Sequence, residues 1–144
     1  MSETAAKKMM LEPEFMRIAS SVDHLALMIH TNAKTKGFHD FGETDAQFRA
    51  RELLNIVGEI SELREAERSG ILDNLCDKAE LMQQLGLEPL TSEEEEYADI
   101  VIRALDHMVR LIKTKKPNRS IGEIIITKHL YNLSRPYKHG RVTA

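Results

Sequence analysis

Apolar residues recur every three or four positions along much of the chain, which is the spacing of one face of an α-helix. The first predicted helix begins near Pro13 and ends at Gly37, because glycine readily takes the left-handed conformation that ends a helix. Thr44 precedes Gln47 by three residues, which is the spacing of a capping box at a helix N-terminus. A second helix is therefore predicted from this box to Gly70.

Two further helices are predicted in the second half of the chain. Ser92 is followed three residues later by Glu95, and this spacing predicts a helix over about 92–113. The same spacing recurs at Ser120 and opens a last helix over about 121–133. The chain therefore contains four substantial helices with short connections, which is typical of a helical bundle.

The remaining segments complete an all-α architecture resembling a four-helix bundle. Residues 1–12 are polar and are expected to form a flexible leader, whereas residues 13–144 are expected to form one domain with a basic C-terminal tail. Within the less regular stretch 71–90, a helix is expected over 71–85 and ends at Gly86. In a bundle, functional sites are built from side chains on facing helices. The wide apolar stripes favour assembly with further copies of the chain.

Composition and charge exclude several classes of protein. With 42% hydrophobic residues among 144 and no Trp, the chain can bury a core and suits long helices better than a β-sandwich. Its 20 basic and 23 acidic residues leave a net charge of −3, so no overall field favours nucleic acid. The longest apolar run, 25–29, is too short to span a membrane. The single cysteine, Cys76, excludes an intrachain disulfide and a multi-cysteine zinc site. We expect a cytoplasmic protein without a secretory signal peptide.

Two pairs of acidic residues stand three positions apart on two of the predicted helices. Glu59 and Glu62 share one face of the second helix, and Glu96 and Asp99 share one face of the third. Either pair alone is more often a solvated helix face than a ligand site. If the pairs face each other at the edge of a core, however, the four carboxylates repel unless a cation compensates them. Mg²⁺ or Mn²⁺ prefers such an all-oxygen ligand set.

The sequence around these acids resembles the paired ExxE and ExxD motifs of the MazG-like all-α nucleoside triphosphate pyrophosphatases. The resemblance covers about residues 28–140, and the ordered segments together are more specific than a single ExxE motif. These segments are Ile29–Ala33, Lys36–Phe38, Gly58–Ala66, Glu95–Asp106, Lys128–Asn132 and Arg135–Gly140. The resemblance implies hydrolysis of a (deoxy)nucleoside triphosphate to the monophosphate and pyrophosphate, acting in nucleotide-pool housekeeping.

The resemblance also implies roles for individual residues. The four metal-binding acids of the family match Glu59, Glu62, Glu96 and Asp99. The first two of these are the candidates for the general base. The positions expected to hold the phosphates match Lys128, Asn132 and Arg135. Asn32 stands where the first helix could approach the base or sugar. Mg²⁺ is the implied cofactor, with Mn²⁺ as a substitute, and a homodimer or homotetramer is the implied assembly.

Several alternatives stay open at this level. The interval 63–95 between the two acid pairs is longer than is usual in the family, so the segment inside it covers the site or builds a contact between copies. A dCTP-selective, dUTP-selective or phosphoribosyl-ATP pyrophosphatase is a related enzyme. A non-catalytic helical oligomerisation or regulatory module, which binds nucleotide or a partner protein, is the rival of another class. Four converging acids favour the enzyme, because a purely structural role needs no such cluster.

Overall fold

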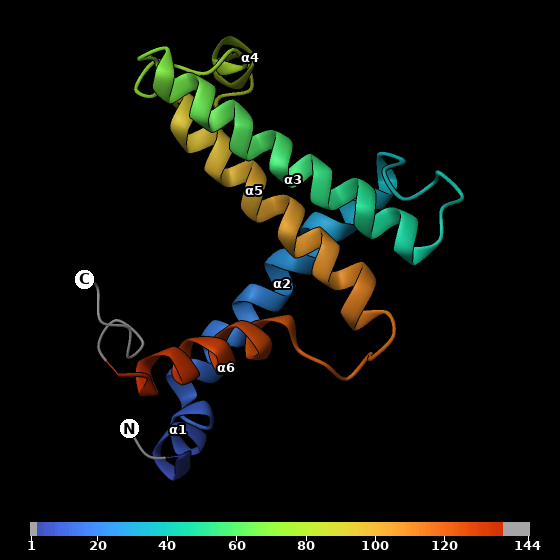
Figure 1. The fold of residues 1–144 in the computed structure, drawn as a ribbon, viewed down its shortest axis with the longest axis vertical. Coiled ribbons are helices and arrows are strands. Elements are labelled where there is room, and N and C mark those ends of the chain that lie inside the picture. Colours follow the sequence, from blue (N-terminus) through green and yellow to red (C-terminus); the bar gives the residue numbers. More distant parts are fainter. Residues whose placement is uncertain (1–2, 137–144) are drawn as a thin grey trace, which may run out of the picture. The chain divides into compact units, whose positions relative to one another are not determined.

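The computed structural model describes residues 3–136, which form α-helices and, within that range, no β-strand (Figure 1). The predicted all-α class is therefore confirmed. No helix among these residues is long and apolar enough to cross a membrane. The elements are α1 (Glu3–Met10), α2 (Pro13–Thr35), α3 (Asp45–Arg68), α4 (Ala79–Gln84), α5 (Ser92–Met108), the π-helical turn η1 (Val109–Lys113) and α6 (Ile121–Ser134).

The chain divides into two compact units. The first unit contains the residues up to Asn32 together with those from Met108 onward, and the second unit is Ala33–His107. Residues 13–144, expected as one domain, thus contribute to both units. The basic tail that was predicted beyond Arg135 lies outside the described residues from position 137.

The first unit contains a small core between α2 and α6. Its buried members are Ala19, Ile126 and Leu130, and the partly buried Met9, Met10 and Phe15 pack against them. Within the segment 1–12, which was expected to be a flexible leader, residues 3–10 form α1, and this helix contacts α6. The two methionines of this segment explain the difference, since they give an otherwise polar helix an apolar side to bury.

The backbones of α2 and α6 approach closely at Gly122. A Cβ atom at this position would lie 2.1 Å from the carbonyl oxygen of Ala19, so only glycine fits. Asp23 of α2 caps the start of α6, because its carboxylate accepts hydrogen bonds from the Ile121 N–H at 2.7 Å and from the Ser120 hydroxyl at 2.5 Å. A carboxylate there also complements the positive end of the helix dipole. The predicted start of this helix at Ser120 is confirmed.

The second unit is built on α3 and α5, which lie side by side and run in opposite directions (Figure 1). The predicted capping box of α3 is confirmed: the Gln47 N–H donates to Thr44 Oγ1 at 3.2 Å, and the Thr44 N–H donates to Gln47 Oε1 at 2.9 Å. The box of α5 is formed by Thr91 and Glu94. It lies one residue before the predicted one, because two cap-forming residues stand side by side in the sequence.

The segment between α3 and α5 is less helical than expected. The predicted helix over 71–85 is wrong for residues 71–78, and only Ala79–Gln84 forms α4. The backbone of residues 72–76 bonds instead to residues 90–93. The Cys76 N–H donates to the Leu90 carbonyl at 2.9 Å, and the Ser92 N–H donates to the Asn74 carbonyl at 2.8 Å. These long-range bonds tie the segment to the start of α5.

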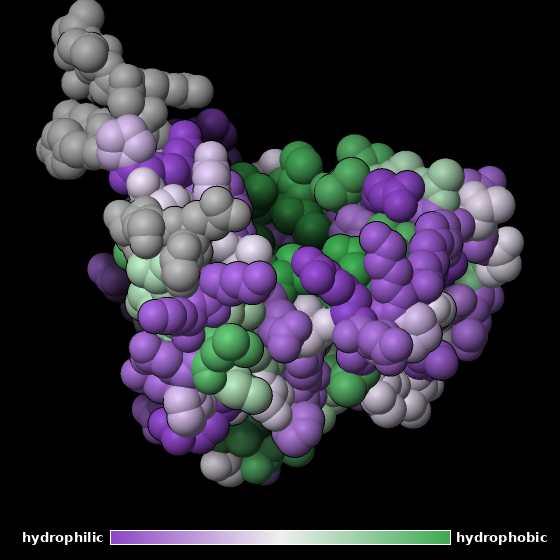
Figure 2. All heavy atoms as spheres, turned by 90° about the horizontal axis from the view of Figure 1, so that it is seen from below, coloured by the Kyte–Doolittle hydropathy of each residue, from purple (hydrophilic) through white to green (hydrophobic). Residues whose placement is uncertain are grey.

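Many large hydrophobic side chains of the described residues reach the surface. Figure 2 shows such hydrophobic residues in green between the polar ones. On α3 they include Leu53, Leu54, Val57 and Ile60, and on α5 they include Tyr97, Val101 and Ile102. Leu54 is 72% exposed, so most of its apolar side chain faces water in a single copy of the chain.

Candidate metal centre

Three of the four predicted acids converge between α3 and α5. Glu59 comes from α3, and Glu96 and Asp99 come from α5. One carboxylate oxygen from each lies within 4.8 Å of the others. The spacing of three residues on α5 places both of its acids on the side that faces α3, as expected from the sequence. Glu59 is buried, and the other two are partly buried.

Glu62, the fourth predicted acid, lies beside this group. It is more exposed than the other three, and it lines the same cavity as Glu96. Its charge contributes to the electrostatic environment of Glu96. The structure therefore brings three of the predicted ligands together, and the fourth lies on the wall of the cavity beside them.

The cluster carries excess negative charge. Burial raises the pKa of Glu96 to about 7, and a hydrogen bond with Glu59 and the negative charges of Glu62, Glu59 and Glu95 act in the same direction. Burial also raises the pKa of Asp99, and the charge of Glu59 adds to the effect. In the absence of a cation, Glu96 therefore retains a proton close to neutral pH.

One atom of the cluster has an unmet bonding requirement. Oε2 of Glu96 is buried and has no hydrogen-bond partner in the protein. A buried carboxylate oxygen without a partner is unfavourable, unless a water molecule donates a hydrogen bond to it or a cation binds it. The donor set consists only of carboxylate oxygens, which is the chemistry that Mg²⁺ and Mn²⁺ prefer. The residues present therefore fit a hard divalent cation.

Arg103 of α5 is part of this site and was missed by the sequence analysis. Its Nε–H donates to Oε1 of Glu59 at 2.7 Å, and its Nη1 lies 3.8 Å from Oε2 of Glu52. A signal existed in the sequence, because Arg103 stands four residues after Asp99 and therefore on a neighbouring position of the same helix face. What the sequence does not give is the register between α3 and α5 that brings it to Glu59.

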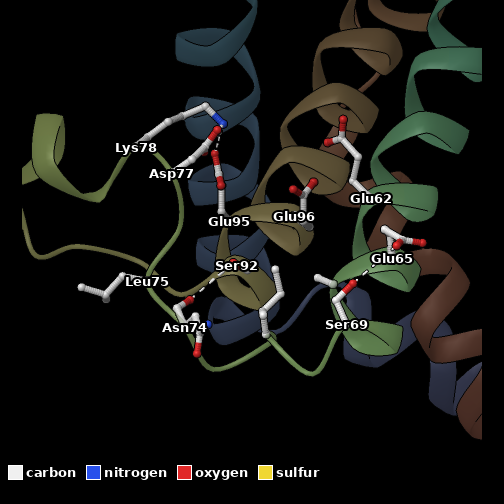
Figure 3. A pocket seen from close by; sticks show the side chains of 12 residues that line it. Glu62, Glu65, Ser69, Asn74, Leu75, Asp77, Lys78, Ser92, Glu95 and Glu96 are labelled. Atoms are coloured by element: carbon white, nitrogen blue, oxygen red, sulfur yellow. Dashed lines mark hydrogen bonds and ion pairs between the residues drawn. The ribbon is translucent and has the colours of Figure 1, made fainter.

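A cavity of about 530 Å³ adjoins the cluster. Figure 3 shows Glu62 of α3 next to Glu96 of α5, with Lys78 meeting Glu95 beside them. Lys78 is the one cationic side chain among the described residues that line the cavity. Its hydrogen bond with Glu95 raises the pKa of the ammonium group. Because residues 71–78 form part of the wall, the long interval between the acid pairs contributes directly to the surroundings of the cluster.

Of the predicted phosphate-binding residues, Lys128 and Asn132 lie on α6 and Arg135 is its C-cap, all in the first unit. The Lys128 ammonium lies 4.6 Å from the centre of the Tyr131 ring, and the Arg135 guanidinium lies 5.7 Å from it. Both cations thus gather around one exposed aromatic ring, and Asn132 is on the same helix. Asn32 lies on α2. The structure therefore groups the predicted acids in the second unit and the predicted substrate-binding residues in the first.

No protein-family model, no curated protein and no solved structure matches this chain.

Proposed function

We propose that this protein hydrolyses a (deoxy)nucleoside triphosphate to the monophosphate and pyrophosphate in a Mg²⁺-dependent reaction. The observation that carries the proposal is the convergence of the Glu59, Glu96 and Asp99 carboxylates, together with a buried oxygen of Glu96 that has no hydrogen-bond partner. A highly anionic substrate can approach such a cluster only when cations neutralise the carboxylates. The resemblance to the MazG-like pyrophosphatases supports the same reaction, with a cytoplasmic role in nucleotide-pool housekeeping.

The three converging acids, with Glu62 beside them, would hold Mg²⁺, for which Mn²⁺ can substitute. When bound, the cation would polarise phosphate oxygens and make a water molecule more acidic. Of the two candidate general bases, Glu59 is engaged by Arg103, whereas Glu62 faces the cavity. We therefore assign Glu62 as the base. Water adds to one phosphorus of the α–β anhydride, Glu62 accepts a proton from that water, and the bridging P–O bond breaks, which releases the nucleoside monophosphate and pyrophosphate.

By the resemblance, Lys128 and Arg135 would bind the phosphates of the substrate. Lys128 and Arg135 offer two cations around Tyr131, and an arginine can hold a phosphate through two parallel hydrogen bonds. Asn132 would add an amide donor, and Asn32 would approach the base or sugar. These four roles follow from the resemblance.

We further propose a MazG-type bundle completed by other copies of the chain, in a homodimer or homotetramer. The support is the exposed apolar surface of α3 and α5, on which Leu54 and Val57 are 72% and 55% exposed. A monomer rarely leaves so many large apolar side chains in water. Burial of this surface against a second copy would be favourable by the hydrophobic effect.

The test is pyrophosphate release from each of the eight common nucleoside and deoxynucleoside triphosphates, with and without Mg²⁺. We expect release from at least one nucleotide only when Mg²⁺ is present, and we expect the Glu62→Gln variant to lose it. The preferred nucleotide would then define the base and sugar that the enzyme accepts. A folded protein that binds Mg²⁺ and releases neither pyrophosphate nor phosphate would contradict the reaction and favour the regulatory module.

A further inference from the structure

Arg103 occupies a fixed place between two buried carboxylates of α3. It donates through Nε to Glu59 at 2.7 Å, and its Nη1 lies 3.8 Å from Glu52. The side chains of Glu59 and Glu52 are only 11% and 6% exposed, whereas that of Arg103 is 35% exposed. The planar guanidinium therefore spans two rigid partners that stand seven residues, or two helical turns, apart on α3.

Glu52 is itself held in place. Its Oε1 accepts hydrogen bonds from Arg51 Nη1 at 2.8 Å and from Asn55 Nδ2 at 3.3 Å. Arg51 in turn donates to Glu43 at 2.6 Å and to the carbonyl oxygen of Phe38 at 3.1 Å. A continuous set of hydrogen bonds and ion pairs thus runs from the loop before α3 to Glu59. This arrangement limits the rotation of Arg103 and, through it, that of Glu59.

We infer that Arg103 is the positioning residue of the metal centre, which fixes the Glu59 carboxylate so that its second oxygen is presented to the divalent cation. This inference depends on the proposed function, because it concerns the same cation site. Oε1 of Glu59 accepts the hydrogen bond from Arg103, and an oxygen of the same carboxylate lies within 4.8 Å of carboxylate oxygens of Glu96 and Asp99. Partners that orient metal-binding side chains in this way often change metal affinity 10- to 100-fold when they are removed.

If Arg103 acted only through its charge, its removal would have the opposite effect on metal affinity. A guanidinium beside a cation site repels the cation, so removal of its charge would tighten metal binding. If Arg103 positions Glu59, its removal weakens metal binding even though a repulsive charge disappears. Lysine separates the two roles further, because it keeps the charge but cannot span Glu59 and Glu52 with a planar group.

The experiment is Mn²⁺ binding to the full-length protein at pH 8 without nucleotide, followed by the electron paramagnetic resonance signal of free Mn²⁺. We expect Arg103→Gln to raise the dissociation constant for Mn²⁺ about 10-fold or more. Arg103→Lys should fall between this variant and the wild type. Arg64→Gln is the matched control, because it removes an arginine of α3 whose ion pair with Glu67 lies at the surface, and its affinity should equal that of the wild type.

Each outcome decides a separate point. Equal or tighter binding by a folded Arg103→Gln variant would overturn the positioning role and leave the proposed function in place. If that variant does not fold, the lysine variant decides, since an affinity equal to the wild type would overturn the inference. A wild-type protein that binds no Mn²⁺ would contradict the cation site itself, and with it the proposed function.

Discussion

Glu96→Gln should make the metal-free protein more stable at pH 8. Glu96 is partly buried, faces other carboxylates and has a pKa raised from its ordinary 4.5 to about 7. Its folded state therefore keeps a proton that the unfolded chain releases. The stabilisation that this proton provides is fully present below pH 4.5 and is lost as the pH rises through about 7. Glutamine resembles the protonated acid at every pH, so the variant does not lose this stabilisation as the pH rises.

The size of the effect follows from the pKa. One pKa unit corresponds to about 1.4 kcal/mol, so the raised pKa sets an upper bound of about 3 kcal/mol. Water on the cavity side of the cluster screens part of this energy, and we expect about 1–2 kcal/mol.

The assay is urea denaturation of wild type and Glu96→Gln at pH 5 and pH 8, with all metal removed by a chelator. The two proteins should have similar free energies of unfolding at pH 5, and the variant should be more stable at pH 8. The difference between the two proteins cancels titrating groups that do not interact with Glu96, such as His107, whose burial lowers its pKa. Mg²⁺ should stabilise the wild type at pH 8 and have little effect on the variant. A variant that is less stable than the wild type at pH 8 would contradict the raised pKa of Glu96 in the folded protein.

Two other substitutions test the cluster and the packing. Asp99→Asn removes a metal ligand, so it should abolish Mn²⁺ binding measured by calorimetry. It should not lower the melting temperature, because it also removes an anion from a repulsive group. A variant that unfolds would instead make Asp99 a structural hydrogen-bond acceptor. Gly122→Ala should cost about 3 kcal/mol in urea denaturation, because the new Cβ would lie 2.1 Å from the Ala19 carbonyl oxygen. Its control is Gly58→Ala in the middle of α3, where a Cβ meets nothing within 4 Å. This substitution should stabilise the helix by about 0.5–1 kcal/mol. Equal effects of the two substitutions would contradict the close approach of α2 and α6.

Helical periodicity made much of the acid cluster predictable. Residues three apart share a helix face, so the spacing of Glu96 and Asp99 was enough to expect both carboxylates on one side of α5. Thr44 and Gln47 likewise predicted the start of α3, because a capping box is a local interaction that sequence spacing records directly.

Long-range partners were not predictable in this way. Residues 71–78 have apolar spacing suited to a helix, but their backbone bonds to residues 90–93, and no local pattern encodes this pairing. The role of Arg103 depends on the register between α3 and α5, which no spacing within one helix provides. The helix α1 forms in a polar segment because two methionines pack against the core of the first unit.

The central claim is that the protein cleaves the α–β bond of a nucleoside triphosphate. The most direct measurement is phosphorus NMR of a mixture of nucleoside and deoxynucleoside triphosphates incubated with the protein and Mg²⁺. We expect resonances of a nucleoside monophosphate and of pyrophosphate to grow together in equal amounts, and neither to grow with Glu62→Gln. Formation of a nucleoside diphosphate with orthophosphate, or an unchanged spectrum from a protein with Mg²⁺ bound, would contradict it.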